Sequence, residues 1–323
     1  MTVSRPQLGV MFRRERDPAT LANEARRVEA LGFDQFWIVE DCFYMGGISQ
    51  AAIALTATST IQVGIGINPG VAHNPAILAM EYATLARAFP GRLVGGIGHG
   101  VAEWMQQIGE TVSSPLTAIE EITSAVSRLL RGERLSVDGR YVTLTDVALD
   151  PAPDVVPPIL LGVRGPKSIA LAGRCADGVL LAELSAPDYV RRTRAIMDVE
   201  RKSPGYIGVY ALGLVDNDDP AAALQTIRQS IAPQLSGGGA SFPIDVLPFA
   251  DDLKTLAGQG GADALRTSMP DDWIRQLSVV GDTGDCLHAL DGYAAAGADS
   301  VILVPMPEWD WSNWLESASS LVR

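Results

Sequence analysis

A phosphate-binding turn is the clearest chemical pattern in the sequence. The stretch GVRGPKSIALAG, residues 162–173, places Arg164 between two glycines, directly before a predicted helix with Pro166 and Lys167 in its first turn. A helix N-terminus offers unpaired N–H groups and the positive end of the helix dipole, which together attract phosphate. The residues expected to bind a cofactor phosphate are Gly162, Val163, Arg164, Gly165, Pro166 and Lys167. An ordinary strand-to-helix turn with solvated basic side chains is the alternative.

An acidic pair offers proton chemistry. In VEDCFYMGG, residues 39–47, Glu40 and Asp41 follow an apolar stretch, and Phe43 and Tyr44 come directly after them. Because side chains alternate along a strand, one of the two carboxylates should face a site at the strand's end. We expect Glu40 and Asp41 to be candidate proton partners. Phe43 and Tyr44 would supply aromatic walls for a substrate, and a loop with surface acids is the alternative.

Two glycine-rich stretches could lie against a flat ligand. In residues 64–75, GIGINPGVAHNP, glycines within a strand indicate a bulge or a close approach of ligand to backbone, and Asn68 could bond the edge of a heterocycle. Residues 95–105, GGIGHGVAEWM, lack the spacing of the dinucleotide fingerprint, so we interpret Gly98 as clearance for a ring and His99 as a third candidate proton partner. The expected cofactor contacts are Gly64, Gly66, Ile67, Asn68, Gly98 and His99, and the further substrate contacts are Glu103 and Trp104. A packing bulge and a structural histidine are the alternatives.

Eight apolar stretches of strand length alternate with helical patterns and would hold these residues. They cover residues 7–12, 33–40, 61–68, 91–98, 157–163, 177–183, 206–215 and 298–305. Three of the helix-to-strand junctions share one layout, with Asp34, Asp177 or Asp299 ahead of a buried strand. Repeated strand–helix units that close on themselves predict an α/β fold, a (β/α)8 TIM barrel, and a doubly wound open sheet is the alternative. In a barrel the active site lies at the C-terminal ends of the strands, where the residues above fall.

Two insertions interrupt this alternation in what we expect to be a single domain over residues 1–323. The first, at about 132–157, begins with GERLSVDGRYVTL, which predicts a β-hairpin with an Asp-Gly turn. The second, residues 232–271, follows the seventh strand and is rich in Gly and Pro and then weakly helical. Long insertions tend to be functional, and we expect this one to act as a lid over the mouth of the barrel.

Composition excludes several classes of function. The hydrophobic content of 47% and charged content of 20% are typical of a globular protein, and the net charge of −13 disfavours nucleic acid and anionic membranes as partners. No apolar run reaches the roughly 18 residues of a membrane span, and the N-terminus lacks the apolar core of a signal peptide, so we expect a cytoplasmic protein. The three cysteines and three histidines lack metal-binding spacing, so we expect no metal, and we interpret His73 as structural.

Several of these pieces together resemble a known family. They are GFDQFWIVED, the long stretch over residues 64–100, RGPKSIALAGRCADGVLL and AAGADSVILVP, in order across about residues 7–305. The chain resembles the luciferase-like monooxygenase superfamily, and is most similar to its coenzyme F420-dependent oxidoreductases of the methylenetetrahydromethanopterin reductase-like group. The resemblance implies a (β/α)8 barrel with insertions, often a homodimer, no metal, and a flavin-type ring across the mouth. It further implies a non-proline cis peptide within residues 64–68 and the cofactor phosphate at residues 162–167.

The resemblance implies hydride transfer between the deazaflavin F420 and a small organic substrate. The alternatives are an FMN-dependent monooxygenase of the same fold that uses O₂, a flavin- or deazaflavin-binding protein without turnover, and a barrel enzyme without flavin, such as an isomerase or lyase. One feature departs from the family. Many relatives carry Asp-His at the end of the second strand, where this chain has Glu40 and Asp41 followed by Cys42. His99, Glu40 or Asp41 would therefore have to supply the proton.

Overall fold

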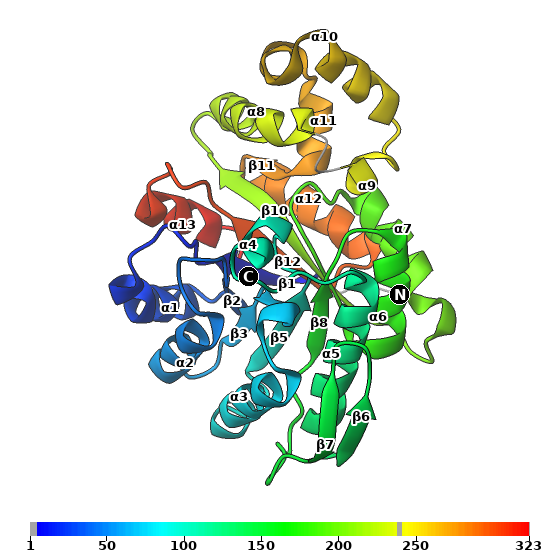
Figure 1. Ribbon diagram of the computed structural model, residues 1–323. Coiled ribbons are helices and arrows are strands. Elements are labelled where there is room, and N and C mark those ends of the chain that lie inside the picture. The colour runs from blue at the N-terminus through cyan, green and yellow to red at the C-terminus, as the bar shows by residue number, and fades with distance from the viewer. Residues whose placement is uncertain (1–4, 238–240, 323) are drawn as a thin grey trace.

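Eight parallel strands form a closed barrel in the computed structural model, which describes residues 5–237 and 241–322 (Figure 1). In order around the barrel they are β1 (Gln7–Met11), β2 (Gln35–Ile38), β3 (Gln62–Ile65), β5 (Leu93–Gly98), β8 (Ile159–Gly162), β9 (Gly178–Leu181), β10 (Tyr206–Val215) and β12 (Ser300–Val304). Each strand pairs in parallel with the next, and β12 pairs with β1. This closure confirms the predicted TIM barrel and all eight predicted strands, and excludes the open sheet.

Helices cover the outside of the barrel, one after most strands (Figure 1). They are α1 (Leu21–Ala30), α2 (Gly47–Ala57), α3 (Pro75–Ala88), α5 (Pro115–Leu130), α6 (Pro166–Cys175), α7 (Pro187–Met197), α12 (Thr283–Ala296) and α13 (Trp311–Ser319), with the shorter α4 (Ala102–Gln107), η1 (Pro18–Thr20), η2 (Gly70–Ala72) and η3 (Asp198–Glu200). Local sequence fixes the ends of these helices. In α3, Asn74 accepts the N–H of Ala76 and Pro75 occupies the first turn, while α12 ends at Gly297, whose φ of 94° suits glycine.

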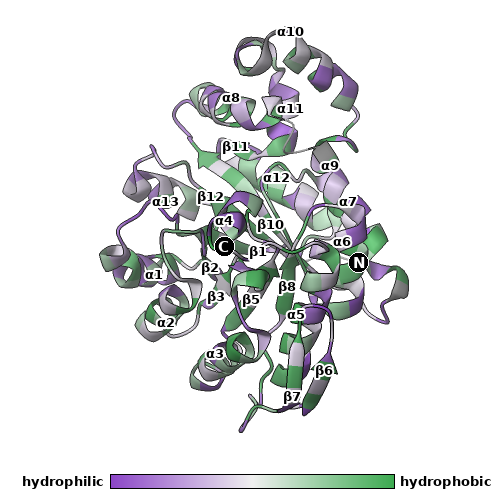
Figure 2. Cartoon of the chain, in the orientation of Figure 1, coloured by the Kyte–Doolittle hydropathy of each residue, from purple (hydrophilic) through white to green (hydrophobic). Residues whose placement is uncertain are grey.

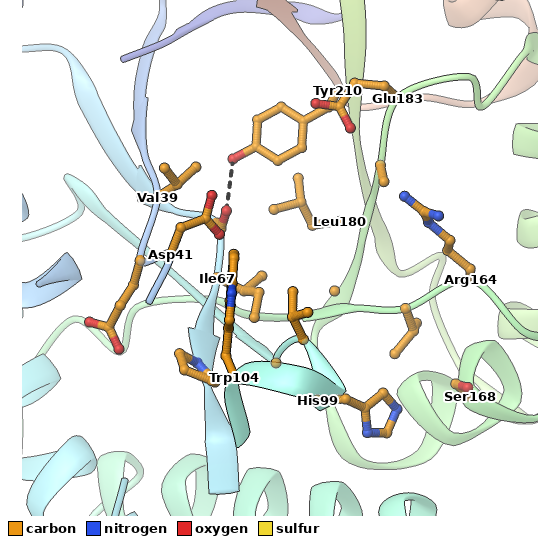
Figure 3. A pocket seen from close by; sticks show the side chains of 18 of the residues that line it. Val39, Asp41, Ile67, His99, Trp104, Arg164, Ser168, Leu180, Glu183 and Tyr210 are labelled. Atoms are coloured by element: carbon orange, nitrogen blue, oxygen red, sulfur yellow. Dashed lines mark hydrogen bonds between the residues drawn. The ribbon is translucent and has the colours of Figure 1, made fainter. Parts of the chain in front are cut away.

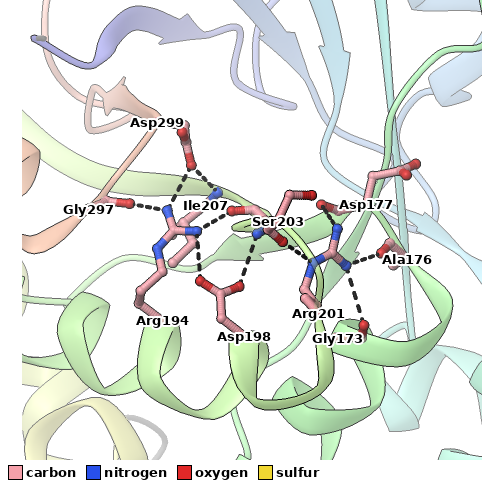
Figure 4. A network of polar contacts seen from close by, with 11 residues as sticks. Gly173, Ala176, Asp177, Arg194, Asp198, Arg201, Ser203, Ile207, Gly297 and Asp299 are labelled. Carbon is pink, nitrogen blue, oxygen red and sulfur yellow. Dashed lines mark hydrogen bonds and ion pairs between the residues drawn. The ribbon is translucent and has the colours of Figure 1, made fainter.

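The three repeated aspartates fasten the N-terminal ends of neighbouring strands. Each carboxylate accepts the backbone N–H near the start of the adjacent strand. The pairs are Asp34 with Leu8, Asp177 with Ile159, and Asp299 with Ile207, each at 2.8 Å. Two arginines extend this network at one side of the barrel, as Figure 4 shows: Arg194 pairs with Asp299 at 3.0 Å, and Arg201 donates to the carbonyl of Ala176 at 2.8 Å. The repeated sequence layout thus has a structural cause, because each aspartate links its strand to the start of the adjacent strand at the N-terminal end of the barrel.

Apolar side chains divide between the outside and the inside of the barrel. The strands are hydrophobic along their length, while polar residues gather on the outer faces of the helices (Figure 2). One buried cluster packs the helices against the sheet, and a second fills the barrel interior, where the rings of Trp37 and Tyr210 meet edge to face at 5.9 Å. Within the described residues, none of the helices has both the length and the apolar character to cross a bilayer.

The first insertion contains the predicted hairpin, and the second is more regular than predicted. Strands β6 (Leu135–Asp138) and β7 (Thr143–Val147) pair antiparallel, with the Asp-Gly step at the turn. The second insertion follows α8 (Pro220–Ser236) and consists of α9 (Ser241–Ile244), α10 (Ala250–Ser268) and α11 (Asp271–Leu277), ahead of a short strand, β11 (Val279–Gly281), that pairs with β10. The helical pattern expected in the later part of this insertion is present as α10, where Leu253 and Leu265 are buried and Gly260 and Gly261 interrupt the helix.

Candidate active site

A cavity of about 560 Å³ opens at the C-terminal ends of the barrel strands (Figure 3). Its volume lies within the range of about 300–1,000 Å³ that is usual for small-molecule sites. The predicted site residues that line it are Glu40, Asp41, Gly66, Ile67, His99, Trp104, Gly162, Val163, Arg164 and Gly165. The structure therefore brings together candidates from four strand ends and from helix α4. The other predicted residues do not line this cavity.

Ile67 supplies part of the cavity floor and rests in a slot between two glycines. The peptide bond between Gly66 and Ile67 is cis, as the resemblance implies, and it interrupts the third strand before the short strand β4 (Asn68–Pro69). A Cβ on Gly98 would stand 2.7 Å from Ile67 Cδ1, and a Cβ on Gly162 would stand 2.7 Å from Ile67 Cγ2. The predicted cofactor role of Gly98 is wrong, because it does not line the cavity; it makes room for Ile67 instead.

Gly64 is also a packing residue. A Cβ at Gly64 would stand 2.3 Å from Trp37 Cδ2, inside the barrel and away from the cavity lining. Its predicted contact with a cofactor is therefore wrong. Gly66 does line the cavity, and its carbonyl accepts a long hydrogen bond from the Tyr210 hydroxyl at 3.4 Å (Figure 3). Tyr210 buttresses the cis peptide from the far side of the barrel.

Glu40 anchors the bulge from below. Its Oε2 accepts the N–H of Gly47 at 2.6 Å and an amide N–H of Asn68 at 2.9 Å, and its Oε1 lies 2.6 Å from His73 Nε2. Asn68 is fully buried, and its Oδ1 accepts the Tyr82 hydroxyl at 2.6 Å. The expectation that Asn68 bonds a heterocycle is wrong, since both ends of its amide are occupied within the protein.

These contacts keep the Glu40 carboxylate ionised. Burial raises the pKa of Glu40, but hydrogen bonds with His73, the Gly47 N–H and Asn68 outweigh it and lower the pKa from its ordinary value. The same hydrogen bond to Glu40 raises the pKa of His73, against the effect of burial. His73 is structural, as predicted, but its partner is a predicted catalytic residue. We expect Glu40 to serve as an anchor, because a carboxylate with three donors is a weak proton acceptor.

A second acidic group stands on the cavity wall beside an arginine that the sequence did not single out. Asp41 Oδ2 accepts from Arg14 Nη1 at 2.8 Å, and the Arg14 guanidinium lies over the rings of Tyr44, at 4.8 Å, and Trp104, at 5.8 Å. Asp41 and Trp104 line the cavity, whereas Tyr44 does not. The ring of Tyr44 contacts Arg14, and its role as a substrate wall stays a prediction.

Two further predicted substrate contacts point to solvent. Phe43 is the more exposed of the two aromatic residues after the acidic pair, and Glu103 lies on the exposed face of α4. Neither lines the cavity. Their contacts with a substrate stay predictions.

The predicted phosphate turn divides into an inner and an outer half. Arg164 and Gly165 line the cavity together with Ser168, which stands in the first turn of α6 and was not predicted (Figure 3). Pro166 and Lys167 are exposed and face other surface depressions, Lys167 beside Glu120 of α5. Neither residue lines the cavity, and their contact with a cofactor stays a prediction.

His99 lies on the wall at the end of β5, on the same side of the cavity as Ser168 and Arg164 (Figure 3). Burial lowers the pKa of His99 from its ordinary value, so the imidazole is neutral near pH 7. A neutral imidazole can accept a proton, which makes His99 chemically distinct from the two ion-paired carboxylates.

Sequence reasoning missed several lining residues. They include Met11, Val39, Ser168, Leu180, Ala182, Glu183 and Tyr210. Met11, Val39 and Glu183 stand at or next to strand ends, so the rule of strand ends points to them. Tyr210 lies in the middle of the long strand β10, and no local pattern marks it. Among the described residues, no three His, Cys, Asp or Glu side chains group closely enough to hold a metal ion.

Comparison with known proteins shows a family match over most of the chain and similarity to several named enzymes. The family model described as luciferase-like monooxygenase matches residues 2–300. The chain is 25% identical over 291 residues to 5,10-methylenetetrahydromethanopterin reductase of Methanolobus tindarius, covering 87% of this chain and 89% of the relative. It is 30% identical over 250 residues to F420-dependent glucose-6-phosphate dehydrogenase of Beutenbergia cavernae, covering 70% and 74%. The structure of coenzyme F420-dependent tetrahydromethanopterin reductase from Methanopyrus kandleri superposes with a TM-score of 0.80 at 21% identity over 99% of both chains.

The slot for Ile67 can be tested by filling it. Gly98→Ala should destabilise the protein by about 1–3 kcal/mol, because the added methyl group overpacks against Ile67. Gly258→Ala is the matched control, since a Cβ there meets nothing within 4 Å and the residue lies within α10. Urea unfolding followed by circular dichroism measures both. Equal stability of Gly98→Ala and the control would contradict the packing role.

Proposed function

The chain belongs to the luciferase-like monooxygenase family, and on that premise we propose that it is an F420-dependent oxidoreductase. Relatives named as F420-dependent enzymes, together with the cavity at the strand ends, support this proposal. The observation that carries it is the combination of a cis Gly66–Ile67 floor with an arginine and a helix N-terminus at the opposite corner of one cavity. That pairing suits a ligand with a flat ring at one end and a phosphate at the other.

The residues present fit such a cofactor. Ile67 and Leu180 offer apolar surface for a ring, and the N-cap of α6 is Gly165, which lacks a side chain that would compete for the helix N–H groups. Arg164 and the Ser168 hydroxyl stand at the same corner. Arg164, Gly165 and Ser168 would hold the phosphate, and the ring would lie against Ile67. When bound, F420 supplies two-electron hydride chemistry, and the protein supplies orientation and electrostatics.

His99 is the proton partner in this proposal. Asp41 is paired with Arg14, and Glu40 holds three donors, so neither carboxylate is suited to take a proton. His99 lines the cavity, and burial keeps it neutral. In the oxidation of a substrate, F420 would supply the hydride acceptor, and the imidazole of His99 would accept the proton of the substrate's hydroxyl group. The helices of residues 241–277 come close to the phosphate corner at one point, where the ring of Phe242 lies near Gly165. A lid function for these helices stays a prediction.

A homodimer is the second element of the proposal. Ile53 of α2 and Ile77 and Met80 of α3 are 42%, 51% and 49% exposed, although they are large apolar side chains. The two helices are neighbours on one side of the barrel (Figure 1). Apolar side chains gathered on adjacent helices are typical of an interface between subunits. The cytoplasmic location stays a prediction from the sequence.

Titrations of the protein with F420 and with FMN, monitored by fluorescence quenching, test the cofactor proposal. The wild-type protein should bind F420 more tightly than FMN. Arg164→Ala should weaken F420 binding at least about tenfold, because a charge-assisted contact with phosphate is lost. Lys167→Ala is the matched control and should change the affinity less than about twofold, since Lys167 faces away from the cavity. Tighter binding of FMN would favour the monooxygenase alternative, and binding of neither would favour a barrel enzyme without flavin.

His99 can be tested through the pH dependence of kcat/KM. Because its pKa is lowered, activity should persist below the ordinary imidazole pKa of 6.5 and then fall on the acid side. His99→Asn should lower kcat by about 10²–10⁴-fold and remove that acid limb. His288→Asn, on α12, should leave the profile unchanged. Full turnover in His99→Asn would rule out the role.

Sedimentation equilibrium tests the dimer. The wild-type protein should be a dimer, and the double variant Ile77→Glu/Met80→Glu should be a monomer, because two charges would be buried in the interface. Val199→Glu, at an equally apolar but more exposed residue of η3, should remain dimeric. A monomeric wild type, or a dimeric double variant, would contradict the assignment.

A further inference from the structure

We propose that the Arg14–Asp41 pair excludes phosphorylated substrates from the substrate side of the cavity, so that the substrate class is one without a phosphate group. This inference rests on the proposed function, because it concerns the space left beside an F420 cofactor. One relative is named for a sugar phosphate, glucose 6-phosphate. The geometry of the Arg14–Asp41 pair points to a different substrate for this chain.

Asp41 presents its negative charge to the cavity, and Arg14 lies behind it, outside the lining. Asp41 lines the cavity, whereas Arg14, bonded to it at 2.8 Å, is not among the lining residues. The two side chains are about equally buried, 31% and 33% exposed, so neither is a loose surface group. A phosphate that entered here would meet a carboxylate first. The guanidinium that would attract it is already occupied by that carboxylate.

Arg14 cannot readily swing into the cavity. Its guanidinium lies between the rings of Tyr44 and Trp104, which come from the β2–α2 loop and from α4. Its Nε also donates to Glu15 at 3.1 Å, and Glu15 accepts from Arg13 Nε at 3.0 Å. These contacts hold the arginine from several loops at once. The outward-facing Tyr44 thus has a role in fixing the wall, although it does not touch the cavity.

The loop beyond the pair is held as well. Arg13 donates to the carbonyl of Pro305 at 3.0 Å, which ties the segment after β1 to the end of β12. The group of Arg13, Arg14, Glu15 and Asp41 contains two cations and two anions, so it is electrically neutral as a unit. Changing Asp41 to a neutral residue leaves this unit with one positive charge beside the cavity. The Asp41 carboxylate is therefore what prevents Arg14 from acting as a phosphate site.

The neighbouring walls of the cavity also carry carboxylates, as Asp41 does. Glu40 and Glu183 line the cavity, and the cation that lines it, Arg164, stands at the corner assigned to the cofactor phosphate. Met11, Val39 and Trp104 add apolar and aromatic surface beside them. Carboxylates accept hydrogen bonds from hydroxyl groups and repel phosphate. A substrate that offers hydroxyl groups and carries no phosphate satisfies these walls.

The test compares glucose 6-phosphate with glucose as probes of wild-type protein, Asp41→Asn, Arg14→Met and the double variant Arg14→Met/Asp41→Asn. Dissociation constants are measured by isothermal titration calorimetry, with and without F420. Asp41→Asn is nearly isosteric with the wild-type residue. Asp41→Ser is measured as well, so that the role of the carboxylate can still be tested if one of the two variants does not fold. Thermal unfolding checks the fold of each protein.

Glucose 6-phosphate should bind Asp41→Asn at least about tenfold more tightly than it binds the wild type, and the double variant should lose that gain, since Arg14 is its source. Arg14→Met alone should show no gain, and the affinity for glucose should not rise in any variant. Wild-type protein that binds glucose 6-phosphate as tightly as Asp41→Asn would overturn the inference, as would an Asp41→Asn variant that gains nothing. Failure of F420 to bind would contradict the proposed function alone, because the comparison without cofactor still decides the role of Asp41.

Discussion

The site depends on the space that the barrel leaves for one side chain, that of Ile67. Ile67 follows a cis peptide and turns its side chain into a slot that only glycine can leave open, between Gly98 of β5 and Gly162 of β8. Two neighbouring strands therefore carry glycine at their ends, where a side chain would otherwise pack. Glu40 secures the far side of the same bulge through Asn68, and also reaches the N-terminus of α2 through Gly47. The floor of the cavity is thus fixed by its neighbours rather than by its own strand.

Two acid–base pairs lie around that floor, and each has a different structural role. Glu40 with His73 supports the bulge, and Asp41 with Arg14 forms a wall. His99 is the titratable group that burial leaves neutral, which suits it to proton transfer. Pairing two of the acids holds their side chains in place, and the imidazole of His99 stands apart from both pairs. In the proposed function, Arg164 would offer the cofactor phosphate a local positive charge within a strongly acidic chain.

Sequence patterns predict the barrel well, because strand length, the aspartate junctions and helix caps are local. Asp34, Asp177 and Asp299 each find a backbone N–H of the adjacent strand, which the repeated layout indicates. The direction of single side chains could not be predicted in the same way. Lys167 and Asn68 have suitable chemistry at suitable positions, but Lys167 lines a different surface depression, and a buried network occupies Asn68. Tyr210 and Arg14 were missed because their roles arise from contacts between distant strands and loops.

In the proposed function, the bulge at Gly66 and Ile67 and the N-terminus of α6 together hold F420. A crystal structure of the protein with F420 is the most direct test. The deazaflavin ring should lie against Gly66 and Ile67, and the phosphate should lie beside Arg164, Gly165 and Ser168. A ring bound away from Ile67, or a phosphate placed at Lys167, would contradict it.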